Sequence, residues 1–382
     1  MKKILVLGPI GDYGGREIEA GFIANVLSSQ YDVTIFSTGS LTKKSQVFHF
    51  NHRQKVLTLS GLLIKKFFVF RLLSFLSFLK SNFAGSISDY ANNGVLKRKF
   101  GYHQKAVEII DELVPQYDVL FICAQLSSNF LHESIHAAKK NNVKVIFRTT
   151  GYITDSNFGY LNGVDCFLHH SFRNAEALKS HGEHQYLLID QCAFNEKQLL
   201  QIPVVNEKVR CFLTLARLVR NKNIDVVIEA FQKIRQSGDK LYIIGDGTEK
   251  QELMKLAEAD NDIVFTGHVS NDNISNYFKK ADCVIISHYD METGPLTGVE
   301  AMAAGRMIIS AKTGAMQERL PFNDFWFDNT TEDLAAQMLK VKALEKSQVF
   351  QKATEIRTRY KSEYNISAIA GRYLSCVAAL ID

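Results

Sequence analysis

The stretch Glu292-Thr-Gly-Pro-Leu-Thr-Gly-Val-Glu300 decides the fold of this 382-residue chain. It follows the apolar run Cys283-Val-Ile-Ile286 and precedes the small residues Ala301-Met-Ala-Ala304. This order predicts a strand, a loop and a helix that carries an acid near its start. Unpaired backbone N–H groups and the helix dipole favour an anion at such a helix N-terminus, and glycines let the anion approach closely. We therefore expect a diphosphate on the loop, with the Glu300 carboxylate placed to accept hydrogen bonds from a sugar diol.

Three upstream segments show a similar order of strand and polar turn. The first, Phe212-Leu-Thr-Leu-Ala-Arg217-Leu-Val-Arg-Asn-Lys222, ends in cations. The others are Leu241-Tyr-Ile-Ile-Gly245-Asp-Gly247 and Val264-Phe-Thr-Gly267-His268-Val269. Taken alone, each feature is ordinary, because Gly-Asp-Gly is a common turn, acids eight residues apart are frequent on surfaces, and charges at strand ends are usually solvated. The order and spacing of the four segments carry the prediction.

In this order the segments resemble the retaining GT-B glycosyltransferases of the family-4 type, described as glycosyl transferases group 1. Glu292 and Glu300 match the E-x7-E motif of that family. The resemblance implies an α/β chain with the GT-B fold, in which two Rossmann-like domains face a central cleft. It also implies that Glu292 contacts the transferred sugar, while Arg217 and Lys222 neutralise the diphosphate that leaves. The donor-binding residues that it implies are Glu300, Gly294, Pro295, Leu296, Thr297, Gly267, His268, Val269 and Gly245.

The length of the chain and its alternating pattern predict two domains. Strand-length apolar runs alternate with helical stretches almost throughout, which favours parallel sheets covered by helices. A proline and polar residues interrupt the pattern at 201–207. We place an acceptor-binding domain at 1–195, completed by a crossover helix at about 366–382, and a donor-binding domain at 196–365. Strands are expected at 4–7, 33–36, 119–122, 143–147, 166–168, 211–215, 241–244, 263–265, 283–286 and 307–309.

Composition and charge narrow the class of protein. With 46% hydrophobic and 22% charged residues, the chain is not disordered as a whole. Basic residues outnumber acidic ones by 21 to 15 in the first 195 positions, whereas the remainder has 24 against 25. The first half is therefore expected to meet something anionic. Six cysteines without C-x-x-C spacing indicate reduced core residues of a cytoplasmic protein, and no secretion signal opens the sequence.

Residues 41–100 break the alternation. They hold eleven Lys and Arg against the single acid Asp89. Within them, 61–80 is strongly apolar, but Lys65, Lys66 and Arg71 interrupt any run long enough to span a bilayer. Drawn as one helix, the segment gathers most of its Phe and Leu on one side and most of its Lys and Ser on the other. Two interpretations stay open, an interfacial helix on anionic lipid and a helix packed inside the domain.

The first strand is followed by Gly8-Pro-Ile-Gly-Asp-Tyr-Gly14-Gly15-Arg16, whose spacing does not fit a dinucleotide fingerprint. In the resembled family a Gly-Gly pair at this place lets the backbone approach donor phosphate and acceptor, which implies this role for Gly14 and Gly15, with Arg16 adding charge. Thr150 stands where the family commonly has a histidine beside the transferred sugar. Since retaining transfer is usually pictured with the leaving phosphate taking the acceptor proton, a histidine base is not required.

No cofactor and no metal are expected besides the nucleotide-sugar substrate. The only D-x-D match, Asp260-Asn-Asp262, precedes a strand instead of ending one, and no histidine pair has zinc spacing. Arg217 and Lys222 would replace a metal at the diphosphate.

The sequence therefore predicts a retaining, metal-independent glycosyltransferase that moves a sugar from a UDP- or GDP-sugar to a glycan or lipid-linked acceptor in surface polysaccharide, O-antigen or capsule biosynthesis. We expect it in the cytoplasm at the inner face of the membrane, in peripheral contact with anionic lipid, and not on nucleic acid. Two alternatives remain. One is a non-catalytic GT-B subunit that binds a nucleotide sugar or a partner enzyme, and the other is a GT-B sugar-nucleotide epimerase.

Overall fold

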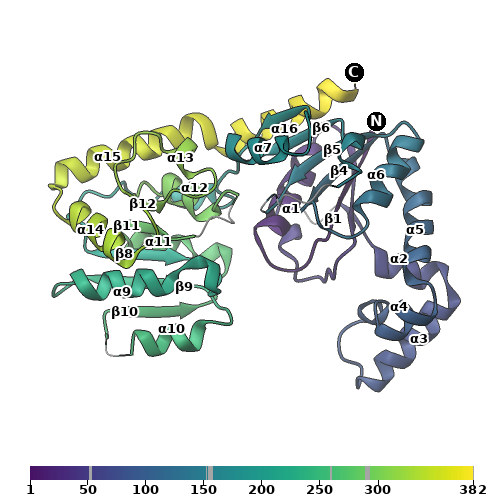
Figure 1. The fold of residues 1–382 in the computed structure, drawn as a ribbon, viewed down its shortest axis with the longest axis horizontal. Helices are drawn as coiled ribbons and strands as arrows, with labels where there is room; N and C mark the ends of the chain where they lie inside the picture. Colours follow the sequence, from purple (N-terminus) through teal and green to yellow (C-terminus); the bar gives the residue numbers. More distant parts are fainter. Residues whose placement is uncertain (51–53, 152, 154–157, 259, 289–292, 382) are drawn as a thin grey trace. The chain divides into compact units, whose positions relative to one another are not determined.

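A computed structural model describes residues 1–50, 54–151, 153, 158–258, 260–288 and 293–381. The chain divides into two compact units, whose elements are labelled in Figure 1. Unit 1 contains Met1–His169, Ala175–Leu188 and Ala370–Asp382, and unit 2 contains His170–Asn174 and Ile189–Ile369. The chain thus enters the main part of unit 2 at Ile189, slightly before the boundary that the sequence suggests.

Unit 1 is built on a seven-stranded sheet in the order β3-β2-β1-β4-β5-β6-β7, and every registered pair is parallel. The five strands predicted for this half are confirmed, whereas β3 and β7 have too few apolar residues to be recognised. The strands are β1 (Lys3–Gly8), β2 (Asp32–Ser37), β3 (Lys55–Thr58), β4 (Val119–Ala124), β5 (Lys144–Thr149), β6 (Cys166–His169) and β7 (Tyr186–Leu188).

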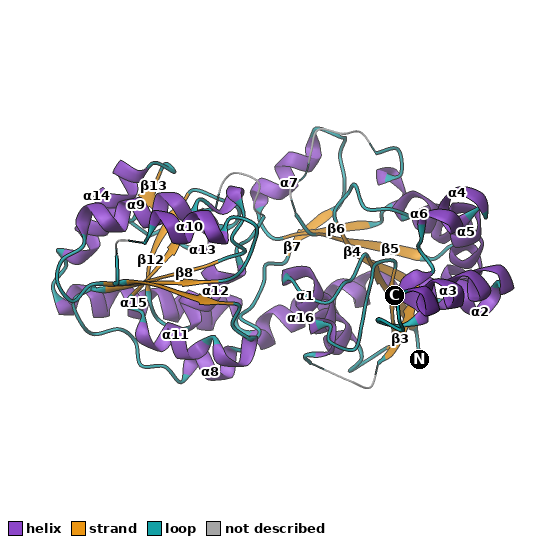
Figure 2. Ribbon diagram, turned by 90° about the horizontal axis from the view of Figure 1, so that it is seen from below, coloured by secondary structure: helices purple, strands orange, loops and turns teal. Residues whose placement is uncertain are grey.

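Helices cover both faces of this sheet, as Figure 2 shows. They are α1 (Gly15–Leu27), α2 (Leu59–Lys66), α3 (Phe68–Lys80), α4 (Gly94–Lys99), α5 (Tyr102–Leu113), α6 (Leu131–Lys140), α7 (Phe172–Lys179) and α16 (Ile366–Ile381). Short helices η1 (Gln46–Phe48), η2 (Ile87–Tyr90), η3 (Val114–Gln116) and η4 (Leu161–Gly163) lie in the connections.

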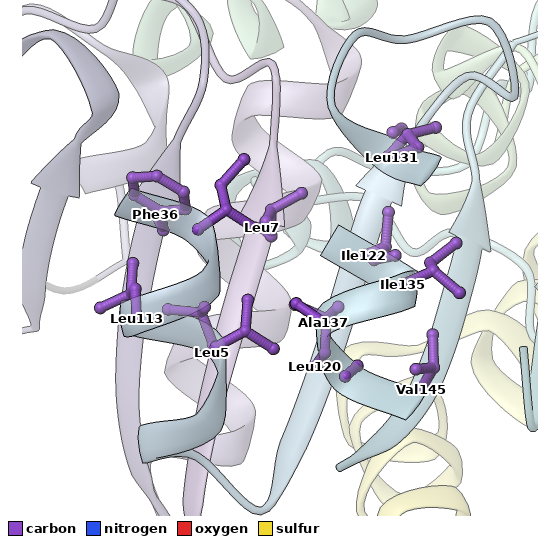
Figure 3. Close-up of a cluster of buried hydrophobic side chains, with 14 of the residues drawn as sticks. Leu5, Leu7, Phe36, Leu113, Leu120, Ile122, Leu131, Ile135, Ala137 and Val145 are labelled. Atoms are coloured by element: carbon purple, nitrogen blue, oxygen red, sulfur yellow. The ribbon is translucent and has the colours of Figure 1, made fainter. Parts of the chain in front are cut away.

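Side chains alternate between the two faces of the strands. Leu5 and Leu7 of β1, with Leu120 and Ile122 of β4, point toward α5 and α6, where Figure 3 shows them against Leu113, Leu131 and Ile135. The intervening Phe121 faces the opposite way and packs on Tyr373 of α16, with ring centroids 6.2 Å apart. Because the central strands β1 and β4 are buried on both faces, their sequences are continuous apolar runs.

A buried ion pair connects three elements of unit 1. The guanidinium of Arg148 on β5 donates to the Glu19 carboxylate of α1 from Nε at 2.9 Å and Nη2 at 2.6 Å. The Tyr373 hydroxyl of α16 donates to the same carboxylate at 3.2 Å. Arg148, Glu19 and Tyr373 are almost fully buried. The C-terminal helix is therefore attached to unit 1 by polar contacts as well as by packing.

The run Lys346–Ile381, which includes α16, is the one helical stretch of the described chain that is long and apolar enough to cross a membrane. Its α16 part is covered on one side, because Ile369, Tyr373, Cys376 and Val377 are buried. We therefore interpret α16 as the crossover helix that the sequence predicts.

Unit 2 is built on a six-stranded parallel sheet in the order β10-β9-β8-β11-β12-β13. The five strands predicted here are confirmed. The strands are β8 (Cys211–Leu215), β9 (Lys240–Ile244), β10 (Ile263–Gly267), β11 (Cys283–Ile286), β12 (Met307–Ala311) and β13 (Trp326–Phe327). The helices are α8 (Glu196–Leu200), η5 (Arg220–Lys222), α9 (Ile224–Ile234), α10 (Lys250–Leu256), η6 (Asn271–Asn273), α11 (Ser275–Lys280), α12 (Leu296–Ala303), α13 (Met316–Arg319), α14 (Thr331–Lys342), α15 (Lys346–Arg359) and η7 (Tyr360–Tyr364).

The prediction of a single helix over 61–80 is wrong. The backbone is extended at Phe67, with φ −113° and ψ 116°, so that α2 and α3 are separate helices. Arg71 stabilises the break, because its guanidinium donates to the carbonyl oxygens of Ile64 and Lys65 at the end of α2. Arg71, which would lie on the apolar side of one long helix, thus caps the end of the first of two shorter helices.

We predict that Arg148→Met destabilises unit 1 by roughly 3 to 5 kcal/mol, because it leaves the Glu19 carboxylate buried without its counter-charge. Urea unfolding followed by circular dichroism measures the loss. Tyr373→Phe is the matched control, which removes one hydrogen bond and should cost only about 1 kcal/mol. Equal costs for both variants would contradict a central role for the ion pair.

Candidate functional site

The carboxyl ends of parallel strands meet at one edge of the unit 2 sheet, and the loops that leave this edge carry the predicted donor residues. Arg217 follows β8, Gly245 follows β9, and the loop before α12 follows β11. Since β9, β8 and β11 are neighbours in the sheet, these loops lie beside one another. Glu292, the first acid of the E-x7-E motif, lies outside the described residues.

Two side-chain hydrogen bonds hold the cation loop against its neighbours. The Ser287 hydroxyl, just past β11, donates to the Lys222 carbonyl at 2.7 Å. The Thr297 hydroxyl of α12 donates to the Leu215 carbonyl at the end of β8, at 3.1 Å. Arg217 is exposed and Lys222 is half-buried. The two cations and the start of α12 are therefore fixed to the same edge.

A tight turn at Asn223 follows Lys222. Asn223 ends η5 and begins α9 in the left-handed conformation, with φ 48° and ψ 43°. Asparagine tolerates this conformation better than most residues, so the turn needs no glycine.

Helix α12 begins without a capping side chain. Pro295 is its N-cap residue, no side chain caps its first N–H groups, and its first turn contains no acid. These amides are suited to an anion for that reason. Gly294 lies in a tight place, because a Cβ atom there would be 3.0 Å from Arg319 Nη2 and 3.3 Å from His170 Cβ. The loop from Gly294 to Thr297 thus combines uncapped amides with a closely packed glycine, and its binding of a diphosphate stays a prediction.

Glu300 is a buried carboxyl in the second turn of α12. Only 2% of its surface is exposed, and it forms no hydrogen bond or ion pair with a residue that the structure describes. Burial raises the pKa of Glu300 to about 7. Buried polar groups are normally paired in proteins, so an unpaired carboxyl here indicates a place for ligand hydroxyl groups.

The two strand-end glycines form the rest of this edge. Gly245 has φ 140°, and a Cβ atom there would lie 1.9 Å from the Ala216 carbonyl oxygen, so only glycine fits. Its N–H donates to the Gly267 carbonyl at 3.0 Å, which brings the ends of β9 and β10 together. Next to Gly267, His268 is exposed and Val269 is half-buried.

A buried cluster around Arg319 was not predicted from the sequence. Its guanidinium donates to the Asp190 carboxylate from Nε at 2.7 Å and from Nη2 at 2.6 Å, while Nη1 donates to the Pro295 carbonyl at 2.5 Å. His170 Nδ1 lies 3.8 Å from the same carboxylate. Arg319 is fully buried and therefore holds the turn that begins α12.

In unit 1 the predicted acceptor loop follows β1. Gly14 precedes α1 with φ 145°, and Gly15 is exposed at the first position of that helix. The Arg16 guanidinium donates to the Glu17 carboxylate at 2.8 Å, and the same oxygen accepts the Gly11 N–H at 3.1 Å. Glu17, which the sequence analysis did not single out, is buried and holds the glycine loop closed.

Thr150 lies directly after β5, where its N–H donates to the Ala124 carbonyl at 2.9 Å. Its hydroxyl is buried and has no hydrogen-bond partner among the residues that the structure describes. The neighbouring Thr149 hydroxyl lies 2.9 Å from His169 Nδ1. Burial, together with the charge of Arg148, lowers the pKa of His169 to about 3, so this imidazole is neutral and structural.

The described part of the chain contains no group of three or more His, Cys, Asp or Glu placed to hold a metal ion. The D-x-D match has another function. Asp260 pairs with Arg235 at 2.5 Å and accepts the Asp262 N–H at 3.0 Å, which makes it the turn before β10.

Each of the two α/β units is built on a sheet of parallel strands. This architecture defines the class of protein, a chain with the GT-B fold of glycosyltransferases. Anabaena HepE in complex with UDP has the same fold, with a TM-score of 0.72, 16% identity and full coverage of both chains. Residues 195–357 match the family described as glycosyl transferases group 1. This match lies within unit 2 and covers less than half of the chain, and the relatives that are similar to the chain are named for lipopolysaccharide, amylovoran and glucosyldiacylglycerol synthesis.

Two curated relatives are similar in part of their length. The lipopolysaccharide 1,2-N-acetylglucosaminetransferase of Salmonella typhimurium is 31% identical over 136 residues, which are 32% of this chain and 35% of that protein. The alpha-monoglucosyldiacylglycerol synthase of Streptococcus pneumoniae is 31% identical over 121 residues, 30% of this chain and 27% of that protein. The chain therefore matches about a third of the length of these relatives.

We predict that Arg319→Met weakens nucleotide-diphosphate binding about tenfold or more and also lowers stability, because it frees the Pro295 turn and leaves Asp190 buried without its counter-charge. Arg319→Lys should rescue little, since lysine cannot make the two-pronged contact. Calorimetric titration and thermal unfolding measure the two effects. The double variant Asp190→Asn with Arg319→Met should regain stability but not affinity for the nucleotide diphosphate. Full recovery of this affinity would show that the Pro295 turn does not need the contact with Arg319.

We predict that Glu300→Gln stabilises unit 2 in a pH-dependent way. An unfolded glutamate ionises near pH 4.5, whereas burial holds the Glu300 proton to about pH 7. Wild-type stability therefore falls as the pH rises between these values, and the variant escapes this loss, which reaches about 3 kcal/mol above pH 7. Trp326, the sole tryptophan, lies in β13 and reports urea unfolding of this unit. If the variant exceeds the wild type in free energy of unfolding by the same amount at pH 5 and at pH 8, the raised pKa of Glu300 is refuted.

Proposed function

We propose that the chain is a retaining glycosyltransferase that moves a sugar from a UDP- or GDP-sugar to a glycan or lipid-linked acceptor in surface polysaccharide biosynthesis. The observation that carries the proposal is the unpaired, buried Glu300 carboxyl beside the uncapped start of α12. One donor molecule satisfies both, because its ribose hydroxyls can donate to the carboxylate and its diphosphate can accept from the helix amides.

Arg217 and Lys222 are proposed to bind the donor diphosphate. When the bond between the anomeric carbon and the phosphate oxygen breaks, negative charge grows on the nucleoside diphosphate. Fixed cations stabilise this charge more in the transition state than in the bound donor, which accelerates the reaction. The hydrogen bonds from Ser287 and Thr297 keep the cation loop in place, so that little reorganisation accompanies bond breaking.

We propose that the acceptor hydroxyl attacks the same face of the sugar that the leaving group departs from. The acceptor oxygen bonds to the anomeric carbon while the phosphate oxygen leaves and takes the acceptor proton. This route needs no protein base, which is consistent with a threonine at position 150. Glu292, outside the described residues, is proposed to contact the transferred sugar, and Gly14, Gly15 and Arg16 to line the acceptor path.

The acceptor and location are proposed from the basic, apolar segment 41–100. A cytoplasmic enzyme at the inner face of the membrane would use this segment to meet a lipid-linked acceptor. The pneumococcal relative is named as a synthase of a glucosyldiacylglycerol, which supports a lipid-borne acceptor as a class. The Anabaena structure that shares the fold was solved with UDP, which makes UDP-sugars the first donors to test.

A panel of UDP, GDP, ADP and TDP with their sugars tests the donor site by thermal unfolding. At about 100 times its dissociation constant, the correct nucleotide should add roughly 2.7 kcal/mol of stability. We predict that Glu300→Ala and Lys222→Ala remove most of this stabilisation. Lys240→Ala, at the start of β9 on the opposite edge of the sheet, is the matched control and should leave it unchanged. Equal stabilisation of all variants by a nucleotide would place its site elsewhere.

Thr150 favours one second candidate, a non-catalytic subunit that binds the nucleotide sugar without turnover. A transfer assay with membrane extracts as acceptor distinguishes the two. Transfer by the purified chain supports the enzyme, and donor binding without transfer or donor hydrolysis supports the subunit. Formation of an isomeric UDP-sugar without acceptor would instead indicate an epimerase.

A further inference from the structure

Helix α3 faces solvent with its apolar side. Phe68 is 70% exposed and Leu76 is 50% exposed, whereas Ser74 is fully buried. We use the term α3 surface for the exposed apolar side chains Phe68, Val69, Leu72, Phe75, Leu76 and Leu79. At 100° per residue they fill an arc of about 120°, which is the arc that a soluble helix normally buries. Because Phe70 is buried on the inner side, α3 is apolar on its inner side and on its exposed side as well.

The inner side of α3 is occupied by protein. The residues after α3 fold back along it, where the Tyr90 hydroxyl of η2 donates to Ser81 Oγ at 2.5 Å and the Asn93 amide donates to Ser77 Oγ at 3.4 Å. Small serines on this side let η2 approach α3 closely. The inner side of α3 thus holds the buried Phe70 together with small serines, while six large apolar side chains of the helix are exposed. Figure 1 shows α3 at the end of unit 1 away from the sheet.

Exposed apolar residues are concentrated in this segment. Of the eighteen large apolar side chains exposed in the described chain, nine lie between Phe68 and Phe100. Single exposed apolar residues are normal on protein surfaces, but a contiguous group marks a binding surface. A hollow of about 490 Å³ adjoins the α3 surface, lined by Gly61, Ile64, Phe68, Arg71, Leu72, Phe75, Ile87 and Ser88.

Cations surround the α3 surface. Arg71 and Lys80 flank the apolar arc on its two sides, and Lys65 lies at the end of α2. Lys97 and Lys99 of α4 add two more charges close in sequence. Lys65, Lys80, Lys97 and Lys99 form no ion pair with any residue of the described chain, whereas Lys66 is paired with Glu108 and Glu112. Asp89 is the only acid between residues 41 and 100.

We propose that the α3 surface lies in the interfacial region of a bilayer that contains anionic phospholipid. The apolar arc would enter the acyl boundary, an acyl chain would fill the hollow, and the lysines would contact the headgroups. With 13 residues, α3 is about 20 Å long, too short to cross a hydrocarbon core of about 30 Å. It therefore lies in the plane of the interface.

Charge decides between lipid and a second copy of the chain. A symmetric dimer through the α3 surface would bring two cationic rims together, which costs free energy. An anionic bilayer presents the opposite charge to the same rim and covers the apolar arc as well. The inference deepens the proposed function by placing the enzyme where a lipid-linked acceptor is found, and it rests on that function only in this respect.

The test is co-sedimentation of the full chain with vesicles of phosphatidylcholine, with or without phosphatidylglycerol. We predict binding only to the anionic vesicles, weakened by added salt. Leu72→Ser with Leu76→Ser should reduce the partition coefficient roughly tenfold or more, because it removes two of the six apolar side chains of the α3 surface. Lys97→Gln with Lys99→Gln should reduce the partition coefficient by about tenfold. This corresponds to roughly 1 kcal/mol or less for each lysine near the membrane surface.

Leu339→Ser with Phe350→Ser is the matched control, since these side chains are 49% and 45% exposed on helices of unit 2. This variant should bind vesicles like the wild type. Binding that the α3 substitutions leave unchanged, or no binding to anionic vesicles, overturns the inference. So does a dimer that the Leu72→Ser, Leu76→Ser variant dissociates without any lipid binding. Nucleotide binding, measured on the same samples, reports the proposed donor site separately, so that failure of one proposal is distinguished from failure of the other.

Discussion

Parallel strand pairing is the constraint on which unit 2 depends. Because β8, β9, β10 and β11 all run in one direction, every loop that leaves their carboxyl ends emerges at one edge. Residues separated by more than 80 positions, such as Arg217 and Glu300, are therefore brought to the same edge by the sheet itself. Side-chain bonds then fix the loops: Thr297 binds the end of β8, and Ser287 binds the cation loop. The sheet determines the approximate position of each loop, and a few side-chain hydrogen bonds determine its exact position.

The edge of the unit 2 sheet that carries the predicted donor residues also contains a group that lowers the stability of this unit. Glu300 is buried without a partner, and ionising it costs free energy that a well-paired carboxylate would not cost. Arg319 is buried too, but Asp190 and Pro295 satisfy it. The two groups have opposite functions for this reason. The satisfied one holds the α12 turn, and the unsatisfied one is proposed to bind a ligand, whose hydroxyl groups can supply the missing hydrogen bonds.

The sequence predicted the elements of the fold well because the strands are buried on both faces. A continuous apolar run such as that of β4 is visible without any knowledge of its neighbours. Short edge strands such as β3 and β7 lack this signal, because they are half-exposed. The positions of the donor residues followed from the order of the strands. The Arg319 cluster did not, because its partners Asp190 and Pro295 are over 100 and over 20 positions away, and a contact between distant positions leaves no periodic pattern.

The α3 segment shows a different limit. Its hydrophobic pattern correctly separates an apolar side from a polar side, but periodicity alone does not tell which side faces the protein. Burial of an apolar face usually decides, since it releases roughly 25 cal/mol per Å² of surface. Here Phe70 and Ser74 are inside, and Phe68, Leu72 and Phe75 are outside. The exposed apolar arc loses that free energy in water, so it is favourable only when something else covers it. An exposed arc of large apolar side chains is therefore a stronger indication of a binding surface than the hydrophobicity of the sequence itself, and only the structure reveals it.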